Sequence, residues 1–441
     1  MKFVSTRNDE NIVSFSDALL NCMPADGGLY VPYECEDLRN WILYADEKTS
    51  FANLAGTLTS ALINKEFSPI ICEAIATRAF YFEPVIRQLD TNLFIMELYH
   101  GPTGTFKDFG VSYLSAALET VLQMNGEKSI LLDATTGELG ACMAQALQGK
   151  KLVKSVLLAP KGKFRGMDES CFIWNGGNVY PIEVDGTEQD CHNLIRKVFN
   201  NQELVKKYHL TVANTANIGR LLPQAFFYTF AFSRIKKHVC GDIFYALPVG
   251  NYGNLVSGLY SWKLALPVNG FIVPVSGNLC FDAEGRVMVM DSFVPLQERL
   301  RADPADPSNL ERMEHIFKAN SLLLRSFVYP SNVSANATVE ACKELFTKYH
   351  VYADQETCMA YAAAKLRKDV FDDDGAVVLV ARNDPSADES FIQQCIGEVP
   401  EREESVIKAF KPVHPGKPAI SPDDSDILIS VLNSLNLLRI F

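Results

Sequence analysis

The chain has 441 residues, which is too long for one compact core and predicts about three domains. Its hydrophobic share of 48% and charged share of 21% are ordinary for a soluble globular protein with a large buried core. The net charge of -12 repels nucleic acid and anionic lipid, so neither is an expected partner. The polar N-terminus and the lack of any apolar run of about 18 residues indicate no signal peptide and no membrane span, so we expect a cytoplasmic protein.

The cysteines and histidines show no pattern of a metal site. The 11 cysteines are scattered and odd in number and include no Cys-x-x-Cys pair, and the seven histidines lack His-x-x-x-His spacing. We therefore expect reduced thiols, no disulfide framework and no metal.

The predicted elements begin with helices and continue as alternating strands and helices. Apolar residues have helical spacing over 15–23 and 51–65, and a turn at 26–28 precedes a short strand. From about residue 90, Gly- or Pro-marked loops and helical stretches follow apolar strands predicted at 93–96, 129–132, 155–158, 243–247 and 376–380. This alternation is typical of an α/β protein whose mainly parallel sheet is covered by helices and binds ligands at strand carboxyl ends. The stretch 398–422 is predicted to be an exposed arm, and 425–438 a helix that packs back on the body.

The first loop at a strand end contains Lys107. By itself, a lysine between Phe106 and Asp108 is most simply a solvated charge. A lysine that reacts with an aldehyde cofactor needs a partly desolvated site that keeps the amine uncharged. Phe106 and Phe109 are compatible with such a site, and the local residues leave both interpretations open.

Three more loops lie between a predicted strand and a helix. The loop 133–140 offers hydroxyls and glycines that suit an anion or simply cap a helix, although Glu138 would repel an anion. The loop 248–254 resembles neither a Walker A loop nor a dinucleotide loop, and its glycines suit a compact phosphate cup. The loop 214–220 carries Arg220, which either binds a second phosphate or is a solvated residue beside a capped helix.

Together these segments resemble the threonine synthase family of enzymes that use pyridoxal 5'-phosphate (PLP), over nearly the whole chain. The most specific match is His100-Gly-Pro-Thr103 followed by Phe-Lys-Asp-Phe-Gly at 106–110, which is similar to the family's cofactor-lysine motif. Residues 3–15 and 24–32 are similar to its N-terminal signature, and 250–253 to its phosphate loop.

The resemblance implies a fold and a reaction. The fold is the α/β, fold-type II (tryptophan synthase β-like) PLP architecture, with mainly parallel sheets flanked by helices. Its expected parts are an N-terminal helical domain over 1–88, a large PLP-binding domain over 89–110 and 205–441, and a small α/β domain over 111–204. The implied reaction is the PLP-dependent conversion of O-phospho-L-homoserine and water to L-threonine and phosphate. The implied partner is thus a small phospho-amino acid, and a monomer or homodimer is expected.

The resemblance also implies roles for particular residues. Lys107 is expected to bind PLP and to move protons at the α and β carbons of the substrate. The expected cofactor-binding residues are Lys107, Gly250, Asn251, Tyr252, Gly253, Asn254 and Arg382. The expected substrate-binding residues are Thr135, Thr136, Gly137, Glu138, Asn214, Thr215, Asn217 and Arg220.

The chain departs from the family's pattern in four segments. The loop 135–140 has a longer acid at Glu138 and loses a hydroxyl at Leu139, and the loop 214–220 is three residues shorter. Arg382 is expected where the family places a threonine at the pyridine nitrogen, and Asp-Gln-Glu-Thr at 354–357 replaces Asp-Pro-His-Thr. These changes leave open a related PLP phospholyase or dehydratase on a hydroxy- or phospho-amino acid, or a catalytically weak paralogue.

Overall fold

A six-stranded sheet forms the base of the molecule. The computed structural model describes residues 1–63, 65–289, 294–318, 320–367 and 374–437. The strands of the large sheet follow the order β13-β10-β9-β14-β4-β3, and all neighbours are parallel except β3 and β4. Their bounds are β3 (Val85–Asp90), β4 (Leu93–Glu97), β9 (Ile243–Ala246), β10 (Gly270–Pro274), β13 (Val328–Ser331) and β14 (Ala376–Ala381). β14 is buried along its whole length, as expected of a strand covered on both faces.

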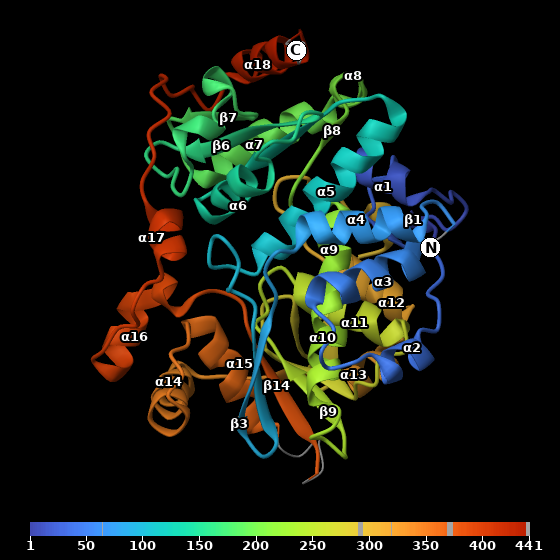
Figure 1. Cartoon of the computed structure of the whole chain (residues 1–441), viewed down its shortest axis with the longest axis vertical. Coiled ribbons are helices and arrows are strands. Elements are labelled where there is room, and N and C mark those ends of the chain that lie inside the picture. Colours follow the sequence, from blue (N-terminus) through green and yellow to red (C-terminus); the bar gives the residue numbers. More distant parts are fainter. Residues whose placement is uncertain (64, 290–293, 319, 368–373, 438–441) are drawn as a thin grey trace.

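A smaller, wholly parallel sheet lies above the first (Figure 1). Its order is β7-β6-β5-β8, with β5 (Ser129–Ala134), β6 (Val153–Pro160), β7 (Val179–Val184) and β8 (Leu210–Thr211). Helices α6 (Glu138–Ala146), α7 (Glu188–Asn200) and α8 (Gln202–Tyr208) belong to this part. The five strands predicted from the sequence and the α/β class are thereby confirmed.

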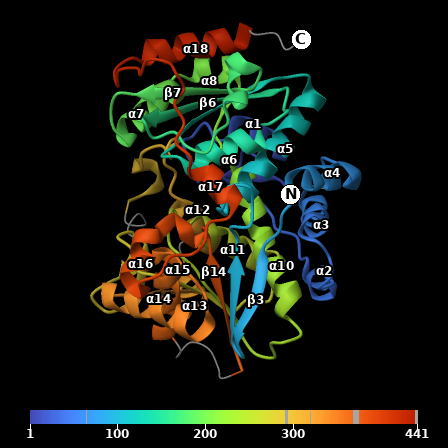
Figure 2. The ribbon, with the colours of Figure 1, turned by 60° about the vertical axis from the view of Figure 1, so that its left-hand side comes forward.

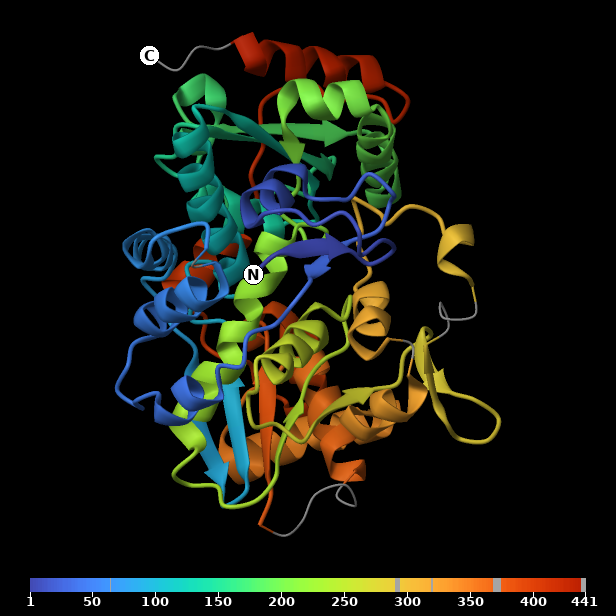
Figure 3. The same ribbon diagram turned by 90° about the vertical axis from the view of Figure 1, so that its right-hand side faces the viewer.

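The N-terminal segment packs against the helix that begins at Lys107. It comprises the antiparallel pair β1 (Phe3–Ser5) and β2 (Tyr30–Pro32) and the helices α1 (Phe15–Asn21), α2 (Arg39–Tyr44), α3 (Phe51–Ile63) and α4 (Pro69–Ala79). In Figure 3 this segment, in blue, faces the viewer. The ring of Phe51 lies 5.3 Å from that of Phe109 on α5 (Lys107–Asn125), with the two planes almost perpendicular. This arrangement favours aromatic pairs, and it fixes the start of α5 from the side of the N-terminal helices.

The remaining helices cover the large sheet and the space between the sheets. They are α9 (Ile218–Leu221), α10 (Ala225–Ile235), α11 (Gly253–Lys263), α12 (Leu310–Phe317), α13 (Ser321–Phe327), α14 (Ala335–Tyr349), α15 (Gln355–Leu366), α16 (Glu389–Ile396) and α17 (Glu404–Phe410). A hairpin of β11 (Leu279–Phe281) and β12 (Val287–Val289) extends from the large part. No helix in the described part of the chain is both long enough and apolar enough to cross a bilayer.

The C-terminal segment crosses from the large sheet to the small one (Figure 2). The backbone of Ile420 forms hydrogen bonds with Glu183 and Asp185 just at the end of β7. The last helix, α18 (Ser425–Leu437), then buries Leu428 and Leu432 in the apolar cluster of the small sheet. The helix predicted at 425–438 is therefore present, although residue 438 lies outside the described residues.

Two expectations differ from this arrangement. The large-domain range 205–441 contains β8 and α18, which belong to the small sheet because they pair with it or bury their apolar residues against it. The predicted exposed arm at 398–422 contains α17, whose Val406 and Ala409 are buried. The arm is thus partly a packed helix.

Candidate active site

A cavity of about 540 Å³ lies between the two sheets, and we call it the lysine cavity. Its walls come from the loops after β5, β9 and β14 and from the start of α5, which agrees with the rule for parallel sheets. Ten of the residues predicted to bind cofactor or substrate line it: Lys107, Thr135, Thr136, Glu138, Asn214, Thr215, Arg220, Gly250, Asn251 and Arg382. Five others do not belong to its lining: Gly137, Asn217, Tyr252, Gly253 and Asn254.

Lys107 is held at the end of β14 by its neighbours. The Phe106 backbone N–H donates to the carbonyl of Arg382 at 2.7 Å, and the Thr105 hydroxyl donates to the Asn383 side chain at 2.8 Å. The Lys107 side chain is 33% exposed, and its amine contacts the carboxylate of Glu138. The lysine is therefore neither a freely solvated charge nor an isolated buried amine.

Asp108 anchors the first turn of α5 from below. Its carboxylate accepts hydrogen bonds from the Thr103 backbone N–H at 2.8 Å and from the Thr103 hydroxyl at 2.7 Å. Burial raises the pKa of Asp108 to about 6, although those hydrogen bonds favour the charged form. The same bonds fold the Gly-Pro-Thr stretch back onto the helix start.

The loop after β5 is organised by Thr135 rather than open to an anion. The Thr135 hydroxyl accepts from the backbone N–H groups of Gly137 at 2.9 Å and Gly140 at 3.0 Å. The expected role of Gly137 in substrate binding is not supported, because its N–H is already bonded and its Cα lies against Arg165. Glu138 starts α6, and Lys107 and, less strongly, Arg165 hold the pKa of the Glu138 carboxyl below its ordinary value.

Asn217 points away from the lysine cavity. Its side chain is fully buried and donates to the Leu19 carbonyl at 2.8 Å and to the Thr211 hydroxyl at 2.9 Å. Its oxygen accepts from the Gly219 N–H at 2.9 Å and caps the short helix α9. The expected contact of Asn217 with substrate is therefore not supported by this geometry, because its polar atoms hold α1, β8 and α9 together.

Arg220, from the same loop, is buried in the wall of the cavity. It is only 3% exposed, and its Nε and Nη1 atoms have no hydrogen-bond partner. The space for Nη1 depends on Gly110, because a Cβ there would lie 2.0 Å from it. Burial lowers the pKa of Arg220 to about 10. Buried guanidinium nitrogens normally donate hydrogen bonds, so an anion in the cavity would supply the acceptors that Nε and Nη1 of Arg220 lack.

The loop after β9 places a short stretch of backbone against the cavity. Gly250 has φ +50°, and Tyr252, which precedes α11, has φ +64°. The Asn251 side chain donates to the Thr215 hydroxyl at 2.9 Å. The start of α11 adds the positive end of a helix dipole, which favours phosphate.

Tyr252 and Asn254, in the same loop, contact residues outside the lysine cavity or in its wall. The Tyr252 hydroxyl contacts that of Ser276, so this side chain does not point into the lysine cavity and only its backbone could take part in a phosphate cup. Asn254 donates to Gln224 at 3.0 Å and accepts from Arg382 at 3.3 Å. Asn254 thus supports a cavity residue rather than lining the cavity itself.

Arg382 closes the wall at the end of β14. It is buried, pairs with Glu356 on α15, and has an unpartnered Nε. A Cβ at Gly250 would lie 2.6 Å from its Nη1, so this glycine is needed for the close approach. Arg382 therefore lies beside the phosphate loop and the lysine loop at once.

The sequence did not single out several lining residues: Glu188, His192, Gln224, Ala305, Asp306 and Glu356. Glu356 falls in the segment 354–357, whose departure from the family pattern could have indicated a residue of the site. The others come from helix faces or from a long connection without a local motif. Within the described residues, no three His, Cys, Asp or Glu side chains are grouped to hold a metal ion.

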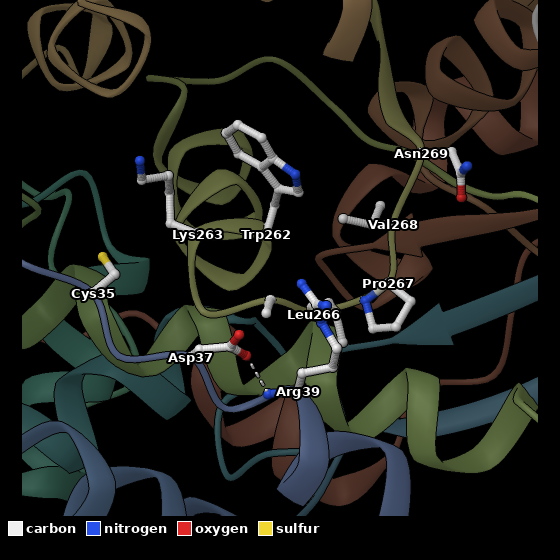
Figure 4. A pocket seen from close by; sticks show the side chains of 10 residues that line it. Cys35, Asp37, Arg39, Trp262, Lys263, Leu266, Pro267, Val268 and Asn269 are labelled. Carbon is white, nitrogen blue, oxygen red and sulfur yellow. Dashed lines mark hydrogen bonds between the residues drawn. The ribbon is translucent and has the colours of Figure 1, made fainter.

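A second cavity, of about 580 Å³, lies between the loop at 35–39 and the stretch 262–269 (Figure 4). Although slightly larger, it contains none of the predicted site residues, and its Asp37 carboxylate accepts from the Arg39 backbone N–H at 2.9 Å. The lysine cavity is therefore the candidate active site.

The chain is similar to known proteins over most of its length. Residues 75–382 match the family model of pyridoxal-phosphate dependent enzymes, and residues 2–80 match that of the threonine synthase N terminus. The threonine synthase of Buchnera aphidicola (subsp. Schizaphis graminum) is 31% identical over 378 residues, covering 84% of this chain and 87% of that protein. The Escherichia coli threonine synthase is 29% identical over 350 residues, covering 78% and 80%.

Solved structures give the same fold. The PLP-bound threonine synthase from Brucella melitensis aligns with a TM-score of 0.81 at 20% identity, over 99% of this chain and 100% of that one. The Escherichia coli threonine synthase aligns with a TM-score of 0.77 at 24% identity, over 98% and 100%. The fold-type II architecture is thus confirmed over almost the whole chain.

Proposed function

The chain belongs to the threonine synthase family of PLP-dependent enzymes, and on that premise we propose that it converts O-phospho-L-homoserine and water to L-threonine and phosphate. One observation carries the proposal: a lysine amine, an unsatisfied buried guanidinium and a phosphate-type loop share one cavity. A phospho-amino acid and PLP together bring two phosphates and one aldehyde, which is the set of groups that this cavity can bind.

The residues present fit PLP. The Lys107 amine is placed to bind the aldehyde, and the backbone of Gly250 and Asn251 at the start of α11 suits the phosphate. Arg382 lies beside both loops and would face the pyridine ring. When bound, PLP supplies an electron sink for negative charge at the substrate carbons, while the protein positions the substrate and moves protons.

Arg220 is the residue we assign to the substrate phosphate. Its guanidinium has two unbonded nitrogens and no carboxylate partner, whereas Lys107 and Arg382 each contact an acid. A phosphate would satisfy those nitrogens with charge-assisted hydrogen bonds. This pairing would set the γ carbon, where phosphate leaves, on the side of Arg220.

Lys107 and Glu138 are the groups we assign to proton movement. The Lys107 amine would take and return protons at the α and β carbons of a substrate held beside it in the cavity. The Glu138 carboxylate contacts that amine and can hold it in place between transfers. Thr135, Thr136, Asn214 and Thr215 complete the polar wall around the substrate.

The test supplies PLP-loaded protein with O-phospho-L-homoserine and measures threonine and phosphate. We expect both products in equal amounts, and we expect Lys107→Ala to lose the visible absorbance of lysine-bound PLP. Phosphate accompanied by a 2-oxo acid would instead support a phospholyase. The withdrawal of Asn217 from the cavity favours that second candidate, because it leaves fewer polar groups near the substrate.

A further inference from the structure

We propose that Arg165 is a positioning residue for Lys107: the C-terminal segment holds it beside Glu138, so that one carboxylate is shared by two cations. The proposal rests on the proposed function, because it takes Lys107 as the PLP-binding lysine. Nothing in the family motifs singled out Arg165, which lies in the loop after β6.

The loop that carries Arg165 is fixed by the C-terminal segment. The Gly166 N–H donates to the Lys411 carbonyl at 2.9 Å, and the Val413 N–H donates to the Phe164 carbonyl at 2.9 Å. Gly166 is enclosed between α17 and α6, since a Cβ there would lie 2.4 Å from the Ala409 oxygen and 2.6 Å from the Ala141 side chain. The backbone of this loop is therefore set by residues about 245 positions later in the chain, a separation that only the finished fold can bring together.

The Arg165 side chain is held from two sides. Its guanidinium carbon lies 4.5 Å from the centre of the Phe410 ring, at cation–π distance. On the other side it lies against Gly137, where a Cβ would approach Arg165 Nε to 2.1 Å. Both contacts come from outside the lysine cavity, and they direct the end of the side chain toward α6.

Glu138 connects this arginine to the lysine. Arg165 Nη2 lies 3.8 Å from Glu138 Oε1, while the second oxygen, Oε2, contacts Lys107 Nζ. The same C-terminal segment also touches the lysine loop, because a Cβ on Gly104 would lie 3.0 Å from Val406. Side-chain contacts thus connect Phe410 to Arg165, Arg165 to Glu138, and Glu138 to Lys107.

The charges predict the direction of the effect. The Glu138 carboxylate contacts the Lys107 amine, and an amine held in an ion pair must leave that pair before it can add to an aldehyde. Arg165 opposes this by sharing the charge of Glu138 and by adding a positive charge of its own. Other charged or titratable groups around the lysine are Asp108 and Cys142 beneath the helix start, Arg220, Arg382 and Glu356 in the wall, and Glu188, His192 and Asp306 also along the lining.

The test measures the rate at which the apoprotein captures PLP as a function of pH. The rate is obtained from visible absorbance after rapid mixing. In Arg165→Met we expect the midpoint of the profile to move up by about 0.5–1 pH unit, so that capture below the midpoint becomes about three- to tenfold slower. Arg165→Lys keeps a charge and should stay near the wild-type midpoint. Phe410→Leu keeps the arginine but removes its support, and it should shift the midpoint upward by a smaller amount.

Arg402→Met is the matched control. Arg402 also lies over the Phe410 ring, at 5.6 Å, but it pairs with Glu389 rather than with Glu138. Its loss removes a cation from the same ring and should leave the midpoint unchanged.

Equal midpoints in Arg165→Met and wild type would overturn the proposal, as would equal shifts in Arg165→Met and Arg402→Met. If Arg165→Met does not fold, wild-type midpoints in Phe410→Leu and in Arg165→Gln would overturn it. Capture of PLP by Lys107→Ala, with the absorbance of a lysine adduct, would instead refute the part of the proposed function that assigns PLP to Lys107. The two failures are therefore distinguishable.

Discussion

Arg382, which directly follows β14, forms an ion pair with Glu356 on α15 in the wall of the lysine cavity. The arginine is buried, while the glutamate side chain is 47% exposed. The pair places a carboxylate close to where the phosphate loop and the pyridine ring are expected. The positive charge of Arg382, which stands where the family has a threonine, is therefore matched by Glu356 from the altered segment 354–357.

Glu356→Gln should tighten PLP binding. The substitution removes a negative charge near a dianionic cofactor and frees Arg382 to attract it. Because the pair is partly exposed, we expect a modest decrease in the Kd for PLP, by about two- to fivefold. The measurement is a PLP titration followed by absorbance. Glu389→Gln, which removes an acid paired with Arg402 instead, serves as the control and should leave the Kd unchanged.

Arg220→Met should stabilise the ligand-free protein and impair the enzyme. The unpaired guanidinium is costly to bury, and a methionine of similar length removes that cost, so the Tm should rise by a few degrees. The KM for O-phospho-L-homoserine should rise by about 30- to 100-fold, the usual scale for a lost charge-assisted hydrogen bond to phosphate. Thermal unfolding and steady-state kinetics measure the two effects. A lower Tm with an unchanged KM would assign Arg220 to the fold alone.

Asn217→Ala should do the opposite. It removes buried hydrogen bonds to Leu19 and Thr211, and we expect a loss of about 1–3 kcal/mol in the free energy of unfolding. Once the variant is folded, the KM should stay within about twofold of wild type, since the side chain does not line the cavity. Urea unfolding and kinetics check this, with Asn214→Ala as a comparison at a residue that does line it.

Asp133 should give the protein a pH-dependent stability. Burial raises the pKa of Asp133 to about 7, above the value of about 3.9 in an unfolded chain. Between these values the folded state binds more protons than the unfolded state. Stability from this group is thus fully present below about pH 4 and is lost as the pH rises through 7. From pH 5 to pH 8, wild type should lose on the order of 2 kcal/mol relative to Asp133→Asn. Urea unfolding at the two pH values measures the difference, and parallel losses would contradict the assignment.

The sequence predicted the parts of this molecule that depend on local patterns. The strands follow from short apolar runs between glycine and proline loops, and the parallel sheet then fixes where Lys107, Thr135 and Gly250 meet. The lysine itself was ambiguous until its motif was read as a whole. These residues are near one another because strand ends are, and no knowledge of distant contacts was needed.

The remaining features depend on contacts between distant residues. The side chain of Asn217 donates to the carbonyl of Leu19, which lies 198 positions earlier in the chain, and no feature of the loop around Asn217 indicates that direction. The burial of Arg220 depends on the glycine at 110. Arg165 reaches Glu138 because the segment 409–413 packs against the loop that carries Arg165. The charge of Arg382 is compensated by Glu356, an acid that the family pattern does not contain at this position.

The packing of α18 has a consequence for how the protein is made. The apolar face formed with α7 and β6 is completed by Leu428 and Leu432, which lie within the last 20 residues of the sequence. Roughly 240 residues separate the end of β7 from the start of α18. Because ribosomes add about 5–20 residues per second, about 10–50 s pass between the synthesis of β7 and that of α18. During that time the small sheet exposes apolar surface, and its closure waits until α18 has been synthesised. Shortening the C-terminus by one helix would make that transient exposure permanent.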